Sequence, residues 1–391
     1  MKSILLLFKL AILLIVVACD DTSDAVVVDP IFVSPIDSTV TTSDTTLFAY
    51  FEQDFLVGVA LPVSMTSNGV DGKIERLIQT QFNSIVDENC LKPIYIQPQQ
   101  GQFNFTDADK YVQFGETYDK KIIGHTLVWH SQVPDWMFVD NQGNEVDRTE
   151  LLSRMKSHIT TTVGRYKGRV HGWDVVNEAI DGGSWRNSKW YSIIGPDFID
   201  SAFHYAAQAD PNAELYYNDY SMNSSSKRAK VVELVNRLKS AGIRIDAVGM
   251  QAHYSLGVSL SEIEQSIQAF ANAGVSVMFT ELDVSVLPWP PGVDPNSAEI
   301  GNDAEYDEKY NPYSDSLPES VQIQLADTYK GLFELFCTHS DKITRVTFWG
   351  LNDGMSWKND FPVKGRTDYP LLFDRNNDPK LAYEYVLNIK K

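Results

Sequence analysis

Short apolar, β-rich runs alternate with helical patterns from Phe55 to the end of the chain, and this alternation constrains the fold more than any other feature. Strict alternation of strands with helices favours a parallel sheet, and eight strands is the number that closes a (β/α)8 TIM barrel. We therefore predict one α/β domain over residues 54–391, a length that such barrels often reach as a single domain. The eight predicted strands are Phe55–Ala60, Ser84–Asn89, Lys121–Trp129, Val170–Asn177, Ala213–Asn218, Ala247–His253, Val277–Asp283 and Arg345–Trp349.

The segments between these runs contain helical patterns. One of them shows a start signal, because Ser261 followed by Glu264 reads as a capping box. The predicted helices include Ile74–Gln81, Arg148–Tyr166, Lys227–Ala241, Leu260–Ala273 and Pro318–His339.

The N-terminus has the pattern of an export signal. A charged start precedes an apolar run from Ile4 to Val17 that is interrupted only by Lys9, and this run falls short of the roughly 20 residues that favour a transmembrane helix. Val16-Val17-Ala18-Cys19 resembles a bacterial lipobox, in which the cysteine is lipidated; a plain signal peptide with an incidental cysteine is the alternative. We predict a lipoprotein signal peptide over residues 1–18 and an exported protein anchored to the outer membrane through Cys19, facing either the periplasm or the outside.

Most of the net charge of −19 lies in two segments. Residues 20–54 hold eight acids and no Lys or Arg, and residues 284–319 hold eight acids against Lys309 alone. We interpret residues 19–53 as an acidic linker, since they lack helical periodicity. The absence of a basic patch argues against nucleic acid, and an uncharged polysaccharide fits this balance, although acidity for solubility alone fits equally well.

Two cysteines remain once Cys19 is assigned to the anchor. Cys90 and Cys337 could pair in an exported chain, but both lie in apolar stretches, which favours two separate buried thiols. Their spacing does not indicate a structural zinc site.

Polar and aromatic residues gather where the predicted strands end. Because a barrel places the carboxyl ends of its strands at the active face, we expect these residues to share one site. They are Glu88-Asn89, His125 to His130, Asn177-Glu178, Asn218-Asp219, Gln251 to His253, Glu281 and Trp349.

Two strand-end glutamates, Glu178 and Glu281, have the chemistry of a glycosidase. Breaking a glycosidic bond needs one carboxyl group to protonate the departing oxygen and a second to attack the anomeric carbon or activate water. A rigid strand end suits both roles. The pair therefore predicts glycoside hydrolysis.

Further motifs give the chain a specific resemblance. From Phe55 to Ile389 it resembles a glycoside hydrolase family 10 endo-β-1,4-xylanase. The motifs that carry the resemblance are His125-Thr-Leu-Val-Trp129-His130-Ser-Gln132, Trp173-Asp-Val-Val-Asn177-Glu178-Ala179, Gly249-Met-Gln251-Ala-His253-Tyr, Thr280-Glu281-Leu282-Asp283, Thr347-Phe-Trp349-Gly-Leu-Asn-Asp-Gly-Met-Ser-Trp357 and Pro370-Leu-Leu-Phe-Asp374.

The resemblance implies a role for each glutamate. Glu178 would be the acid/base and Glu281 the nucleophile, with the carboxyls about 5–5.5 Å apart, the separation that gives retention through a covalent intermediate. Carboxylates so close cannot both ionise cheaply, so we expect Glu178 protonated and Glu281 charged. By the same resemblance, Asn177 would hydrogen-bond the sugar 2-hydroxyl, and His253 would hydrogen-bond Glu281.

The resemblance also implies the substrate-binding residues. A sugar presents hydroxyl edges to charged and amide groups and apolar faces to flat indoles. The implied set is Glu88, Asn89, Lys92, His125, Gln132, Gln251, Trp129, Trp349 and Trp357, with His130 as a further candidate.

Parts of this set have alternative interpretations. Glu88 and Lys92 could form a surface salt bridge instead. The chain also departs from the family's usual sequence at Cys90-Leu91 and at Pro93 to Ile96, which puts the finer subsites for the glycone in doubt. Trp185 and Tyr220 are candidates for the aglycone side. In the long loop 284–317, aromatic residues could stack on sugar rings or merely pack on the barrel: Trp289, Tyr306, Tyr310 and Tyr313.

Two rival functions remain at this stage. Another β-1,4-glycanase, such as a cellulase or mannanase, could use the same barrel, and a glycan-binding surface lipoprotein would be expected to lack a catalytic carboxylate. We predict a monomeric xylanase acting on xylan or xylo-oligosaccharides, with no metal, organic cofactor or nucleic acid, and with a membrane contact only through the lipid anchor.

Overall fold

The computed structural model describes residues 45–66, 71–291 and 307–389. The predicted signal peptide, Cys19, most of the acidic linker and Tyr306 lie outside these residues. No helix within the described ranges is long and apolar enough to cross a membrane.

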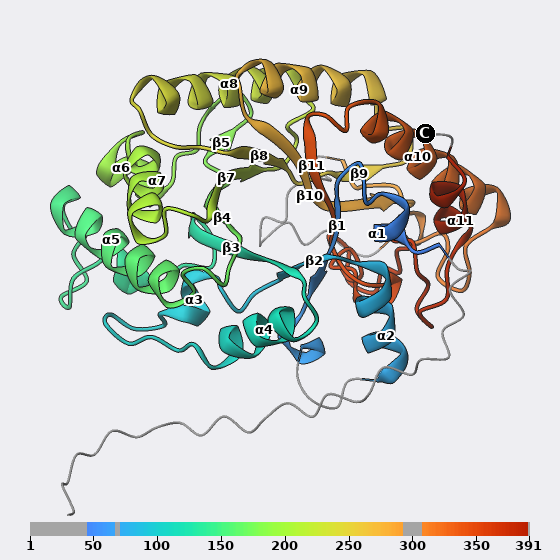
Figure 1. Cartoon of the computed structure of the whole chain (residues 1–391), viewed down its shortest axis with the longest axis horizontal. Helices are drawn as coiled ribbons and strands as arrows, with labels where there is room; N and C mark the ends of the chain where they lie inside the picture. Colours follow the sequence, from blue (N-terminus) through green and yellow to red (C-terminus); the bar gives the residue numbers. More distant parts are fainter. Residues whose placement is uncertain (1–44, 67–70, 292–306, 390–391) are drawn as a thin grey trace, which may run out of the picture. The chain divides into compact units, whose positions relative to one another are not determined.

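Eight parallel strands close into a barrel, which confirms the predicted (β/α)8 fold (Figure 1). The sheet order runs β1, β2, β3, β4, β7, β8, β10, β11, and β11 pairs back onto β1 through Val57 and Val346. The bounds of these strands are β1 Leu56–Leu61, β2 Ser84–Asp87, β3 Lys121–Trp129, β4 Gly172–Asn177, β7 Glu214–Asp219, β8 Ala247–Met250, β10 Ser276–Ser285 and β11 Ile343–Phe348.

Helices surround the strands on the outside of the barrel (Figure 1). The helix α9 corrects one prediction, because its N-cap is Ser259, whose hydroxyl accepts from the backbone N–H of Glu262, rather than Ser261. The described α-helices are α1 Leu47–Tyr50, α2 Gly72–Gln81, α3 Pro93–Ile96, α4 Thr106–Thr117, α5 Arg148–Arg165, α6 Lys189–Ile194, α7 Phe198–Ala209, α8 Ser225–Ser240, α9 Leu260–Asn272, α10 Glu319–Thr338 and α11 Leu381–Leu387.

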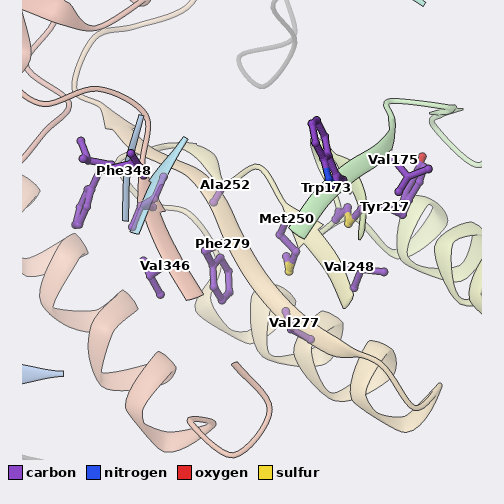
Figure 2. Close-up of a cluster of buried hydrophobic side chains, with 14 of the residues drawn as sticks. Trp173, Val175, Tyr217, Val248, Met250, Ala252, Val277, Phe279, Val346 and Phe348 are labelled. Atoms are coloured by element: carbon purple, nitrogen blue, oxygen red, sulfur yellow. The ribbon is translucent and has the colours of Figure 1, made fainter. Parts of the chain in front are cut away.

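Side chains alternate between the inside of the barrel and the helical layer, as the period of two in a strand requires. Tyr216 and Met278 belong to a small cluster in the barrel interior, whereas their neighbours Tyr217 and Phe279 belong to the larger cluster under the helices. Figure 2 shows Tyr217 and Phe279 within this buried outer cluster. The ring centroid of Phe279 lies 4.0 Å from that of Phe336 on α10.

The predicted strand Ala247–His253 is interrupted. It divides into β8 and a short β9, His253–Ser255, which pairs with the far end of β10 from Asp283 to Ser285. Ala252 lies between them with φ of 65°, a left-handed conformation that breaks the extended chain. The break moves His253 from β8 to the edge of β10.

The packed body begins earlier than the predicted domain start at residue 54. Leu47 and Phe51 are fully buried in the core. The backbone N–H of Leu47 donates to Gln81 at 3.0 Å, and the Tyr50 hydroxyl donates to the carbonyl of Ile389 at 2.5 Å. An apolar face on residues 47–51 therefore joins this part of the predicted linker to the barrel.

Cys90 and Cys337 are both thiols, which confirms the prediction of two separate thiols. Cys90 is buried, but Cys337 is only half-buried on α10.

Candidate active site

Side chains from several strands meet at the carboxyl end of the barrel. Glu178 follows β4 directly, Glu281 lies within β10, and His253 begins β9. Asn218 on β7 and Gln251 after β8 stand between them, and all five side chains are buried. The predicted catalytic residues therefore do share one site.

Glu178 turns into the site through an unusual backbone conformation. Its φ of 56° is rare for a residue with a side chain and is maintained only where neighbours enforce it. The N–H of Glu178 donates to the carbonyl of Asn218 at 2.9 Å, and Arg186 Nε donates to the carbonyl of Glu178 at 2.9 Å. Both backbone groups of Glu178 are thus held by other segments.

A β-bulge orients Glu281. Between Phe279 and Leu282 the pairing of β10 with β11 shifts register, and both of these residues pack in the outer core. The extra residue in β10 allows Thr280 and Glu281 to face the site side by side. Bulges commonly re-aim side chains next to active sites in this way.

Neutral donors surround the carboxylate of Glu178. Trp129 Nε1 donates to its Oε2 at 2.9 Å, and Gln251 Nε2 donates to its Oε1 at 2.9 Å. Asn177 adds a longer contact of 3.3 Å to Oε1, and His130 Nδ1 lies 3.9 Å from Oε2. The strongest contacts of Glu178 therefore come from uncharged N–H groups.

Glu281 has a different set of partners. Asn218 Nδ2 donates to its Oε1 at 2.8 Å, and His253 Nε2 lies 3.1 Å from its Oε2. The other ring nitrogen of His253 lies 3.0 Å from Asp283 Oδ2. His253 thus stands between two carboxylates, and both of its nitrogens can donate only as an imidazolium.

The charge on His253 follows from these neighbours. Burial lowers its pKa, but the charge and hydrogen bond of Asp283, together with those of Glu281, outweigh burial and raise the pKa to about 9. The cation lies in direct contact with a Glu281 oxygen. The predicted contact between His253 and Glu281 is confirmed; Asp283 was not predicted.

Asn218 is the main residue that the sequence left without a role. Its amide is oriented by Thr280, whose hydroxyl donates to Asn218 Oδ1 at 2.5 Å, so that Nδ2 points at Glu281. Gly249 leaves the space for this amide, because a Cβ there would approach Asn218 Oδ1 to 2.5 Å. The polar pair at the end of the fifth predicted strand was the available signal.

Asn177 connects the two halves of the site. Its Oδ1 accepts from Asn218 at 3.0 Å and from Gln251 at 3.3 Å, while its Nδ2 donates to Glu178. The opposite amide orientation would place its NH2 3.0 Å from the Asn218 amide nitrogen, a contact between two donors. Through Asn177, Asn218 and Gln251, the two carboxylates belong to one hydrogen-bond network.

The predicted cluster after β2 lines the same site. Lys92 is 6% exposed, its Nζ donates to Asn89 at 3.1 Å and it lies 5.1 Å from the centroid of the Trp129 ring. Among the described residues Lys92 forms no ion pair with Glu88, so the surface salt bridge is not the correct interpretation. Asp87 orders this turn by accepting from the backbone N–H groups of Asn89 and Cys90.

Electrostatics tie this cluster to the two glutamates. Burial lowers the pKa of Lys92, and the charges of Glu281, Glu88 and Glu178 oppose that effect. Burial and the neighbouring Asp87 raise the pKa of Glu88 to about 7, with Lys92 acting in the opposite direction. A buried ammonium between three carboxyls is well placed to bind hydroxyl groups.

His125 and Gln132 lie on the β3 side of the site. His125 Nδ1 contacts Asp174 Oδ2 at 2.9 Å, which leaves Nε2 as an acceptor when Nδ1 carries the proton. The His125 ring lies edge-on to Trp349 at 5.5 Å. Gln132 has φ of 47°, and its carbonyl accepts from Ile94 at 3.0 Å, so it anchors α3 to the β3 loop.

Three tryptophans surround the site. Trp129 is 8% exposed, and Trp349 and Trp357 are half-buried. Trp357 Nε1 donates to Asp283 at 2.9 Å, and its ring packs edge-on to His253 at 5.0 Å. Partly open indoles beside polar groups are suited to the apolar faces of a sugar.

Several of the remaining aromatic candidates lie against cations. Tyr220 is buried, and Lys227 Nζ lies 3.5 Å from its ring centroid, so it offers no open face. Lys230 lies 4.4 Å from the centroid of the Trp185 ring. Trp289 lies beside Lys358 and Arg366, at 5.2 and 4.6 Å from their charged groups. These contacts favour packing for Trp289, and the buried Tyr220 does not lie open as an aglycone surface.

Within the described ranges, no group of three or more His, Cys, Asp or Glu residues is arranged to hold a metal ion. The site is built from carboxyl, amide, imidazole and indole groups.

A barrel that presents two carboxylates among amide and indole groups has the site of a glycoside hydrolase. The family model described as glycosyl hydrolase family 10 matches residues 46–389, and the chain belongs to this family. Endo-1,4-beta-xylanase A of Xylanibacter ruminicola is 49% identical over 337 residues, which cover 86% of this chain and 90% of that protein. Endo-1,4-beta-xylanase of Geobacillus stearothermophilus is 42% identical over 344 residues, covering 87% and 97%.

A solved structure, a GH10 endoxylanase retrieved from a sugarcane soil metagenome, is similar to this chain with a TM-score of 0.85 and 43% identity. The match covers 88% of this chain and all of that one.

Proposed function

We propose that Glu178 and Glu281 hydrolyse internal β-1,4 bonds of xylan with retention of anomeric configuration. The chain is an endo-1,4-β-xylanase, the activity for which its relatives are named. One observation carries the assignment of roles: Glu281 contacts an imidazolium, whereas Glu178 accepts from neutral donors.

The reaction proceeds in two displacements. In the first, a Glu281 oxygen forms a bond to the anomeric carbon while the glycosidic C–O bond breaks, and the Glu178 proton passes to the departing oxygen. In the second, Glu178 takes a proton from water, whose oxygen attacks the anomeric carbon and releases Glu281. Consuming the charge of Glu281 in the ester favours the change of Glu178 from acid to base.

The surrounding residues hold the sugar in this chemistry. Asn177 donates to the sugar 2-hydroxyl, and Asn218 and His253 orient the carboxylate of Glu281. The cluster Glu88, Asn89 and Lys92 binds glycone hydroxyls, assisted by His125, Gln132 and Gln251. Trp129, Trp349 and Trp357 enclose the sugar at the point of cleavage. The buried, hydrogen-bonded side chains of Asn177, Gln251 and His253 support the proposal.

Product analysis tests both the mechanism and the substrate. NMR of the first products from xylan should show the β-anomer before mutarotation, and an α-anomer would overturn the two-step mechanism. Hydrolysis of xylan should exceed that of cellulose and mannan, and equal or faster cellulose turnover would indicate a different β-1,4-glycanase.

We further propose that the protein is an exported lipoprotein that acts as a monomer at the outer membrane. The support is the lipobox-like segment ending at Cys19. Wild-type protein expressed in a bacterial host should fractionate with membranes and incorporate labelled fatty acid. The Cys19→Ala variant should lose both properties while keeping xylanase activity; an unlabelled wild type would contradict the anchor.

A further inference from the structure

Lys358 is a fully buried lysine directly below the catalytic network. It follows Trp357 in the loop after β11 and has 0% side-chain exposure. Its Nζ lies 3.2 Å from Asp283 Oδ1 and between two indoles, at 5.1 Å from the centroid of Trp357 and 5.2 Å from that of Trp289. Removing an ammonium from water is costly, so a buried lysine needs a strong compensating partner.

Asp283 is one such partner, and its second oxygen contacts His253. Asp283 Oδ2 accepts from His253 Nδ1 at 3.0 Å and from Trp357 Nε1 at 2.9 Å. His253 in turn contacts Glu281 at 3.1 Å. The buried groups Lys358, Asp283, His253 and Glu281 therefore form a row of alternating positive and negative charges.

The row depends on Asp283 being ionised. Burial raises the pKa of Asp283, but the positive charges of His253 and Lys358 oppose burial and hold the pKa below its usual range. A neutral Asp283 would leave His253 without its stronger partner in a site where burial already disfavours the imidazolium.

The other ionisable groups around this row have partners of their own. Tyr329 on α10 donates to the carbonyl of Pro370 at 2.6 Å. Asp368 accepts from the hydroxyl of Ser285 at 2.5 Å, and Arg366 lies 3.5 Å from the same hydroxyl. Asp353 pairs with Lys380 at 2.9 Å. Lys92 is the other cation near Glu281, and its Nζ donates to Asn89. Among the lysines that the structure describes, Lys358 is the one paired with Asp283.

We propose that Lys358 is a positioning residue for the nucleophile, which holds Asp283 ionised and in place and so keeps His253 doubly protonated against Glu281. This inference rests on the proposed role of Glu281. Lys358 acts through two intervening side chains and does not touch the reacting atoms.

The test compares Lys358→Met, which keeps the length but not the charge, with Lys358→Arg, which keeps the charge. An aryl 2-deoxy-2-fluoro-xylobioside reports the first displacement, because it forms a long-lived ester with the nucleophile. We expect Lys358→Met to slow this labelling roughly tenfold to hundredfold, the size of loss that a displacement of about 1 Å in a reacting group can cause. The acid limb of kcat/KM should also move up, because Asp283 is protonated at a higher pH once the charge of Lys358 is removed, and His253 then loses its ionised partner. Lys358→Arg should restore much of the labelling rate and of the original acid limb.

Lys380→Met is the matched control. Lys380 is also a buried lysine paired with an aspartate, but its Nζ contacts Asp353 and the carbonyls of Tyr369 and Leu371 rather than the catalytic row. We expect this variant to lower the Tm without moving the acid limb. The proposal is overturned if Lys358→Met behaves in the same way.

A second comparison covers the case in which Lys358→Met does not fold. Removing Asp283 and Lys358 together leaves no lone buried charge, so adding Lys358→Met to Asp283→Asn should not slow labelling further. A further slowing of roughly tenfold in the double variant, relative to Asp283→Asn alone, would overturn the proposal. Failure of the wild type to be labelled at Glu281 would instead contradict the proposed function, whatever Lys358 does.

Discussion

The two glutamates share one barrel mouth but lie in opposite electrostatic surroundings. Glu281 has an imidazolium on one oxygen and the amide of Asn218 on the other. Glu178 accepts from the indole of Trp129 and the amide of Gln251, both neutral. Identical side chains can thus take different roles, because each role is set by the environment rather than by the carboxyl group itself.

The residues behind the direct partners of the two glutamates also differ. Near Glu178, the buried Asp219 pairs with Lys227 at 2.6 Å. The hydroxyl of Tyr217 donates to Asp219 and accepts from the backbone N–H of Ala179 at 3.1 Å. Burial raises the pKa of Asp219 to about 6, opposed by Lys227 and increased further by Glu178. Lys92 is near both glutamates, but only Glu281 has a cation, His253, in direct contact with its carboxylate, whereas the next layer beside Glu178 holds the carboxyl group of Asp219.

The largest expected effect comes from replacing the glutamates themselves, and it distinguishes the nucleophile from the acid/base. Glu281→Gln should lower turnover roughly 10⁴- to 10⁶-fold on every substrate, because the attacking oxygen is lost. Glu178→Gln should be as damaging on xylan but should retain fast first displacement with a dinitrophenyl leaving group, which departs without a proton. Initial rates and burst kinetics on both substrates measure this. If Glu178→Gln slowed the first displacement equally on the two substrates, Glu178 would not be the acid.

Asn218→Ala should lower kcat roughly 10²- to 10³-fold, the size expected when one donor to a reacting oxygen is removed. The expected loss lies in the labelling of Glu281, with little change in KM for xylan. Gln251→Ala is the matched variant, because Gln251 donates to Glu178 rather than to Glu281 and should slow labelling less. An equal slowing of labelling by both variants would contradict the separate donor sets.

His253 should make folding stability depend on alkaline pH. Its folded pKa of about 9 exceeds the ordinary value of 6.5, so its contribution is complete below pH 6.5 and is lost as pH rises through 9. The pKa shift corresponds to a contribution on the order of 3 kcal/mol to the free energy of unfolding. Denaturant unfolding between pH 6 and 10 should show a flatter profile for His253→Gln than for the wild type; parallel profiles would contradict the buried cation.

The smallest expected effect concerns the indole next to Glu178. Trp129→Phe keeps the ring but removes the N–H that donates to Glu178, a loss of about 1 kcal/mol. The variant should therefore lower kcat/KM on xylan by only a few-fold. A dinitrophenyl leaving group, which departs without a proton, should show a smaller loss in the first displacement, and an equal loss on both substrates would contradict the assignment of Glu178 as the acid.

The sequence predicted the barrel well because its signals are local. Eight apolar runs with a strand-like composition and helical patterns between them needed no knowledge of contacts. Errors arose where a contact overrides local pattern: the predicted strand through His253 is broken by the left-handed Ala252, and residues 47–51 pack on the barrel instead of extending the linker.

The sequence predicted which residues belong to the site, but not the hydrogen bonds and ion pairs between them. Glu178, Glu281, Asn177 and His253 could be identified from motifs, and the structure brings them together. Asn218 could not be assigned, because its role depends on Thr280 and on the space left by Gly249. The same holds for Asp283 and Lys358, whose 3.2 Å contact joins segments far apart in the chain.

By itself, the sequence determined an alternating strand–helix chain with two glutamates at strand ends, since periodicity and residue chemistry are properties of short segments. Only the tertiary structure decided which glutamate receives a cation and which receives neutral donors. The deciding contacts span 49 residues from Trp129 to Glu178, 28 from His253 to Glu281 and 63 from Asn218 to Glu281. The charge state of a buried carboxyl depends on groups within a few ångströms of it, and barrel closure is what brings such distant groups that close.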